Sequence, residues 1–133
     1  MNSTAIQQEG FDVRGPSAAT TFNIACTNTS AAIDLSGANY TGLASALAAG
    51  RMVTLKADGG KVWYRWAAAT GTVDETTTAA STPANQGVSI ADGERVDERP
   101  PAGCSGWLIV KSSVACTLRV YVSSVNPAVF VGA

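Results

Sequence analysis

The 133-residue sequence contains no histidine, and only 14% of its residues are charged. Imidazole is the usual base that activates a serine or cysteine nucleophile, so histidine-dependent triads and dyads are excluded. Lysine occurs only at Lys56, Lys61 and Lys111, and 9 basic residues stand against 10 acidic ones. Because nucleic acids and anionic membranes are recognised by clustered basic residues, neither is an expected partner.

The sequence also lacks the segments that direct a chain to a membrane. Its first ten residues show no basic region followed by an apolar one, and no run approaches the roughly eighteen apolar residues of a membrane span. We therefore expect neither an export signal nor a membrane anchor.

Cysteine is scarce, with only Cys26, Cys104 and Cys116 present. These residues lack CxxC spacing and histidine partners, so a zinc site is not expected, and we expect no metal and no cofactor. If Ser112 and Ser113 centre a hairpin, Cys104 and Cys116 do not face each other across it. This favours free thiols that are buried as small apolar groups.

What the sequence does contain is a repeated alternation of apolar and polar residues, the pattern of half-buried β-strands. It is clearest in residues 51–57 and 61–67, which flank Asp58-Gly59-Gly60, a sequence typical of a tight hairpin turn. A second hairpin is predicted from residues 107–111 and 115–123. The first strand of that pair is apolar on both faces, which indicates a centrally buried strand or one that faces a partner subunit.

Weaker strand signals fill most of the remaining chain, at residues 11–14, 20–26, 31–35, 71–74, 87–90 and 94–98. Residues 40–50 are rich in Leu and Ala and predict one short helix, whereas residues 76–86 are typical of an exposed loop. A chain of this length can bury a single core without disulfides. Together these signals predict an all-β fold, an antiparallel β-sandwich or jelly roll with at most one short helix.

Adjacent carboxylates, Asp74-Glu75 and Asp97-Glu98, are the remaining candidates for acid–base chemistry. Neighbouring residues of a strand point to opposite faces, so neither pair can converge on one substrate by itself. Charged side chains are mostly exposed, and we expect these carboxylates and the three lysines to be solvated. The sequence therefore predicts that the protein is not an enzyme.

The aromatic cluster Trp63-Tyr64-Arg65-Trp66 is the most distinctive chemical feature. Trp63 and Trp66 are three residues apart and so lie on opposite faces of a strand, which predicts one in the core and the other at a surface. An exposed indole could stack on a sugar, but a small sandwich needs its few large side chains for the core and for subunit interfaces, and we favour that interpretation. Arg65 is expected to form a structural ion pair or to donate across an interface.

Three segments resemble small all-β virion proteins of tailed bacteriophages: VTLKADGGKVWYRW (53–66), GVSIADGERVDERPPAG (87–103) and TLRVYVSS (117–124). The shared pattern is a V-T-L-x-A-D-G-G-x-V-x-Y-R hairpin, G-E-R-x-D before a Pro/Gly turn, a buried apolar strand, and T-L-R-V-Y near the C-terminus. The resemblance spans about residues 51–124 and includes no catalytic signature. It implies a capsid decoration (cement) protein or a minor head or tail component, often a jelly roll that assembles as a trimer.

Such a protein would be assembled in the host cytoplasm and would bind the major capsid protein as a homotrimer on the capsid surface of the virion. The alternative is a phage tail protein or a receptor-binding or carbohydrate-binding β-sandwich module. We expect an extended N-terminal arm at residues 1–17, a sandwich domain at 18–125 and a C-terminal tail at 126–133. The polar arm and the apolar end of the tail are candidate contacts, and Phe130 either anchors a partner or folds back on its own sandwich. The candidate interface residues are Trp63, Arg65, Trp66, Trp107, Val129 and Phe130.

Overall fold

The computed structural model describes residues 21–75 and 85–122. The strand expected at residues 11–14, the arm, the tail and the candidate interface residues Val129 and Phe130 lie outside these residues. The described elements are β1 (Thr21–Cys26), β2 (Ala31–Asp34), η1 (Ala38–Tyr40), α2 (Thr41–Ala48), β3 (Val53–Asp58), β4 (Val62–Ala67), β5 (Val88–Ile90), β6 (Arg95–Glu98), β7 (Trp107–Ser112) and β8 (Cys116–Val122).

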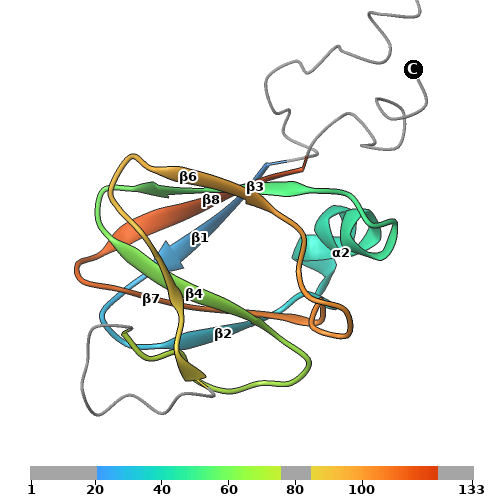
Figure 1. The fold of residues 1–133 in the computed structure, drawn as a ribbon, viewed down its shortest axis with the longest axis horizontal. Coiled ribbons are helices and arrows are strands. Elements are labelled where there is room, and N and C mark those ends of the chain that lie inside the picture. Colours follow the sequence, from blue (N-terminus) through green and yellow to red (C-terminus); the bar gives the residue numbers. More distant parts are fainter. Residues whose placement is uncertain (1–20, 76–84, 123–133) are drawn as a thin grey trace, which may run out of the picture.

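The strands form two antiparallel sheets that pack face to face (Figure 1). Sheet A has the strand order β1-β8-β3-β6, and sheet B has the order β2-β7-β4-β5. Consecutive strands therefore lie in different sheets throughout, except β4 and β5, which are neighbours in sheet B. This is the double Greek-key connectivity of an eight-stranded jelly roll. The predicted all-β sandwich with one short helical segment is confirmed.

Both predicted hairpins are wrong, although their strands form close to the expected positions. β3 pairs with β6 and β8, while β4 pairs with β5 and β7, so Asp58-Gly59-Gly60 links the two sheets instead of closing a ladder. β7 and β8 likewise lie in different sheets. The alternation of apolar and polar residues shows which side chains face the core. It does not show whether the next strand pairs with the first one or lies in the opposite sheet, because the pattern is the same in both cases.

Long-range contacts hold the β3–β4 connection in its crossing path. Gly59 has a φ of 101°, which favours glycine, and its backbone N–H donates a 2.9 Å hydrogen bond to Asp92 Oδ1 in the β5–β6 connection. Asp58 turns outward to Arg119 on β8. These contacts come from segments distant in the sequence, so local turn chemistry did not predict them.

Side chains on the two inner faces form one main core. The largest of its almost fully buried members are Ile24, Leu55 and Leu118 from sheet A, Tyr64, Ile90 and Leu108 from sheet B, and Leu35 and Leu43 from the β2–β3 connection. The helix α2 covers one end of the sandwich (Figure 1) and buries Leu43, Ala46 and Leu47. Residues 71–74 do not form a strand and contribute only a parallel bridge from Asp74 to Gln86.

The helix α2 ends in a Schellman motif centred on Gly50. The N–H of Gly50 donates to the carbonyl of Leu47, and the N–H of Arg51 donates to the carbonyl of Ala46, each at 3.0 Å. Gly50 has a φ of 76°, in the left-handed region that glycine tolerates best. The motif turns the chain from the helix into β3.

Candidate functional site

The outer face of sheet B carries a second apolar cluster, which residues 71–75 cover. Its members are the buried residues Trp63, Ala67, Val73 and Ile109, with the half-buried Ala32 and Trp107 packed against them. Sheet B is therefore apolar on both faces, and β7 is a central strand of it. This explains the wholly apolar start of β7, for which a centrally buried strand was one of the two expectations.

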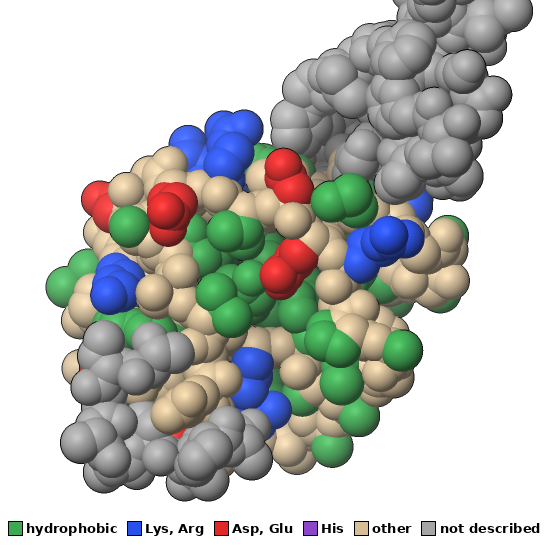
Figure 2. Space-filling view, viewed as in Figure 1, with side chains coloured by type: hydrophobic (Ala, Val, Ile, Leu, Met, Phe, Trp, Pro, Cys, Tyr) green, Lys and Arg blue, Asp and Glu red, His purple; other side chains and the backbone are tan. Residues whose placement is uncertain are grey.

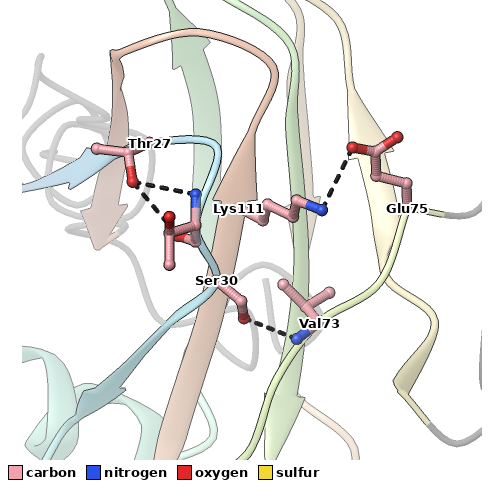
Figure 3. A network of polar contacts seen from close by, with 6 residues as sticks. Thr27, Ser30, Val73, Glu75 and Lys111 are labelled. Carbon is pink, nitrogen blue, oxygen red and sulfur yellow. Dashed lines mark hydrogen bonds and ion pairs between the residues drawn. The ribbon is translucent and has the colours of Figure 1, made fainter.

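Polar contacts fix residues 71–75 to the sandwich (Figure 3). The backbone N–H of Val73 donates a 2.9 Å hydrogen bond to Ser30 Oγ in the β1–β2 connection. Two residues on, Glu75 Oε1 lies 3.4 Å from Lys111 Nζ on β7. These contacts attach the segment to β7 and to the residue that precedes β2.

Arg65 on β4 also forms hydrogen bonds that hold this segment. Its Nε donates a 2.7 Å hydrogen bond to the carbonyl of Thr72, and its Nη2 lies 3.4 Å from Asn85 Oδ1. Both partners are neutral oxygens, so within residues 21–75 and 85–122 Arg65 forms hydrogen bonds and not the expected ion pair. Its alternative role as a donor across an interface stays a prediction. Gly71 permits the close approach, because a Cβ at that position would lie 2.7 Å from Arg65 Nη2.

The structure buries both indoles of the aromatic cluster. Trp66 is 9% exposed on the inner face of sheet B, and Trp63 is 5% exposed on the outer face. The expectation that one of them lies at the surface is wrong, because residues 71–75 give the outer face an apolar cover. Lys61 Nζ lies 5.1 Å from the ring centroid of Trp63, and Trp63 Nε1 is buried with no hydrogen-bond partner among the described residues. Trp107 is half-buried on the same face, and its interface role stays a prediction.

An inward-facing carboxylate lies at the edge of sheet A. Glu98, the last residue of β6, accepts a 2.6 Å hydrogen bond from Trp66 Nε1 on sheet B. The neighbouring phenol of Tyr64 is buried and makes no hydrogen bond of good geometry to the part of the chain that the structure describes. Burial and, after it, the nearby Glu98 carboxylate raise the pKa of Tyr64. The sequence already indicated that Glu98 points inward. It lies two residues after the core-facing Val96, and alternate residues of a strand point to the same face.

The outer face of sheet A is polar. Arg119 Nε lies 2.8 Å from Asp58 Oδ2, and Arg119 Nη1 lies 3.4 Å from Asn23 Oδ1. Thr54 Oγ1 donates to Asp97 on β6. Asp97 and its neighbour Glu98 thus point to opposite faces of the sheet, as the sequence predicted, so this pair cannot act on one substrate.

A cavity of about 250 Å³ lies where the C-terminal end of α2 meets the chain after β6. Arg51, Arg99, Pro100 and Gly103 are among the residues that line it. Arg99 Nη1 lies 3.4 Å from the carbonyl of Gly50 at its edge. The cavity is mixed in polarity and contains no nucleophile paired with a base.

Two large apolar side chains are exposed among the described residues: Val88 on β5, at 55%, and Val114 in the β7–β8 turn, at 53%. β5 is one of the two edge strands of sheet B, and β6 is one of the two edge strands of sheet A. The view in Figure 1 looks onto the side of the sandwich along which the chain passes from β5 to β6. Figure 2, from the same direction, shows hydrophobic side chains gathered in the middle of this side, with charged groups around them.

Comparisons with protein-family models, with curated proteins and with solved structures found no match. Within residues 21–75 and 85–122, no three His, Cys, Asp or Glu side chains come together in a way that could hold a metal ion. The helical segment of the described chain is too short to cross a membrane.

Proposed function

We propose that this protein is a structural virion protein of a tailed bacteriophage, a capsid decoration (cement) protein rather than an enzyme. The observation that carries the proposal is the strand order β1-β8-β3-β6 facing β2-β7-β4-β5, because this jelly-roll fold is used in viral capsid domains. A fold does not define a function by itself. The phage-like segments add support, since they supply β3 to β6 and β8 of this jelly roll.

The side chains described above favour a role in binding over one in catalysis. Arg65 and Glu98 each hydrogen-bond within the protomer, to Thr72 and to Trp66, and join parts of the sandwich to one another. The protein would bind the major capsid protein on the capsid surface by shape and by modest apolar contacts. Partners in this role are the shell and further copies of the chain, with no nucleic acid, membrane or cofactor required.

The proposed mechanism is that three copies assemble about a local threefold axis and bridge neighbouring major-capsid subunits. Closed symmetry repeats each contact three times, so that avidity replaces high affinity at any one contact. Binding across the boundaries between capsomers would stabilise the shell.

The side of the sandwich between β5 and β6 is the proposed contact region. Both are edge strands, and edge strands present unpaired backbone groups to a partner. Val88 adds an exposed apolar side chain on β5. An apolar patch that is surrounded by polar and charged residues is typical of a protein interface.

The alternative function, a tail or carbohydrate-binding module, has less support. Stacking on a sugar requires an exposed indole face, and Trp63 and Trp66 are both buried. Trp107 is the one described tryptophan that is half-exposed, so the alternative predicts glycan binding that is lost in Trp107→Ala.

The test combines light scattering with sedimentation. We expect the purified full-length chain to be a trimer, to co-sediment with expanded phage capsids that lack it, and to raise the temperature at which those capsids break. A monomer that stays in the supernatant would overturn the proposal. Specific binding on a glycan array without capsid binding would favour the alternative.

Val88→Asp tests the contact region, with Val114→Asp as a matched control. The two valines have nearly equal exposure, but only Val88 lies on an edge strand. We expect Val88→Asp to lose capsid binding or trimer formation and Val114→Asp to retain both. Equal behaviour of the two variants would contradict the assignment of the contact to β5.

A further inference from the structure

Cys26 and Cys116 face each other across the ladder between β1 and β8. They are the last residue of β1 and the first of β8, and they are direct partners in the antiparallel register. Directly opposite residues of an antiparallel pair point to the same face. Both lie on the inner face, where Cys26 is 2% exposed in the main core and Cys116 is half-buried against it.

This register brings the two residues within bonding range. Directly opposite Cα atoms in antiparallel ladders are about 4.5–5.5 Å apart, and disulfides join Cα atoms about 4.4–6.8 Å apart. The structure records all three cysteines as free thiols. The hairpin expected from the sequence bore only on the placement of Cys104 and Cys116. That hairpin does not form, and the pairing of Cys26 with Cys116 was not predicted.

We propose that Cys26 and Cys116 are a dithiol site that closes to a cross-strand disulfide when the folded protein meets a small-molecule disulfide oxidant. The bond would tie β1 to β8 at the end of their ladder. This inference does not depend on the proposed function.

The reaction balances as thiol–disulfide exchange. The Cys116 thiolate attacks one sulfur of the oxidant, whose S–S bond breaks and releases one small thiolate. Cys26 then gives up its proton and attacks the Cys116 sulfur of the mixed disulfide, which expels the second small thiolate. The two protein thiols are oxidised, the oxidant is reduced to two thiols, and the two protons end on these leaving groups.

The order of the steps follows from the surroundings of the two sulfurs. Burial, and after it the neighbouring Cys116, raises the pKa of the Cys26 thiol to about 11, so Cys26 is the poorer first nucleophile. Cys116 is the more exposed of the two. Gly60 in the β3–β4 connection lies beside it, and a Cβ there would come 3.5 Å from Cys116 Sγ.

The disulfide would stabilise β1, because of the position of this strand in the sheet. This strand is at the edge of sheet A, and its one ladder among the described residues is with β8. An edge strand frays more readily than a central one, because it is paired on one side only. A link at Cys26 would also close most of the chain into one loop, which restricts the unfolded state.

The third cysteine provides the control. Cys104 precedes β7 and Cys116 follows it, so the strand separates them by roughly 20 Å. The test protein is the full-length chain with Cys104→Ser, treated while folded with oxidised glutathione. We expect a mass lower by about 2 Da, because two thiol hydrogens are lost, a tryptic peptide that joins Cys26 to Cys116, and a thermal midpoint higher by several degrees. Reductant should reverse all three.

Cys26→Ala and Cys116→Ser, each in the Cys104→Ser background, should show no internal link and no rise in thermal midpoint, and the melting curve of each verifies that it folds. The proposal is overturned if the Cys104→Ser protein gives only a glutathione adduct or a dimer between chains. It is also overturned if the wild-type protein links Cys104 to either of the other cysteines.

Discussion

Trp66 Nε1 on β4 donates a 2.6 Å hydrogen bond to Glu98 Oε1 on β6, so a single side-chain pair joins the inner face of one sheet to the edge strand of the other. Trp66 is 9% exposed, so its indole N–H is largely removed from water, and Glu98 supplies the acceptor that water would otherwise provide. Glu98 is the last residue of β6, so the bond lies at the end of this edge strand.

Removal of the Glu98 carboxylate should destabilise the fold. Glu98→Ala leaves the Trp66 N–H buried without an acceptor, at a cost of about 1–3 kcal/mol in the free energy of unfolding. Glu98→Gln keeps an acceptor oxygen and should lower the free energy of unfolding clearly less than Glu98→Ala does. Urea unfolding followed by tryptophan fluorescence measures both values. Equal losses in the two variants would show that the hydrogen bond is not the cause.

The protein should become less stable as the pH rises from 9.0 to about 11. The pKa of Cys26 rises from 9.0 to about 11 on folding, so over this window the unfolded chain releases the thiol proton that the folded protein keeps. The contribution of Cys26 to the free energy of unfolding is therefore fully present below pH 9.0 and is lost as the pH approaches 11.

Urea unfolding in the presence of reductant, repeated across this pH window, checks the expectation. Cys26→Ala should show a shallower decline than the wild type, whereas Cys104→Ala should follow the wild type. Parallel curves for Cys26→Ala and the wild type would exclude Cys26 as a source of the pH dependence.

Gly87 should resist even the smallest side chain. A Cβ at this position would lie 2.5 Å from Val73 Cγ2 and 2.9 Å from the carbonyl oxygen of Tyr64, and the backbone contact cannot be relieved by a rotamer change. We expect Gly87→Ala to cost about 1–3 kcal/mol, the range for overpacking. Gly106→Ala is the control, since its nearest contact would be 3.9 Å away. Thermal unfolding that ranks the two variants equally would argue against close packing of Val73 and the β4 backbone around Gly87.

The C-terminal turn of α2 should depend on the left-handed conformation of Gly50. Nothing lies within 4 Å of a Cβ at this position, so the cost of Gly50→Ala comes from the backbone alone, with a φ of 76°. We expect a loss of about 1 kcal/mol, comparable with the strain of a non-glycine residue in this region. Gly50→Asn should lose less, because Asn tolerates this conformation. Chemical denaturation distinguishes the two, and a Gly50→Asn loss as large as that of Gly50→Ala would refute the conformational explanation.

The sequence predicted the elements of the sandwich well and their partners poorly. Nine strand segments were predicted within residues 20–123, and eight of them, all except 71–74, lie within two residues of an observed strand at both ends. Residues 71–74 were expected to form a strand and instead cover sheet B. Their polar and small residues give them little to bury except Val73, which reaches the outer cluster because Arg65 and Ser30 hold the backbone there.

The candidate site was only partly accessible from sequence. Alternation placed Trp63 and Trp66 on opposite faces of β4, which the structure confirms, but it could not show that the outer face is covered as well. The inward position of Glu98 could have been predicted from its spacing of two residues from the core-facing Val96. The proximity of Cys26 and Cys116 could not, because 89 residues separate them and only the pairing of β1 with β8 brings them together.

The sequence by itself determined the all-β class and the side chains that enter the core, because a two-residue period fixes which face of a strand each residue occupies. The tertiary structure decided which strands pair. The same alternation suits a hairpin or a crossing between sheets, and the glycines after Asp58 permit both. Contacts from distant segments, from Asp92 to Gly59 and from Arg119 to Asp58, accompany the crossing that makes the sandwich a jelly roll.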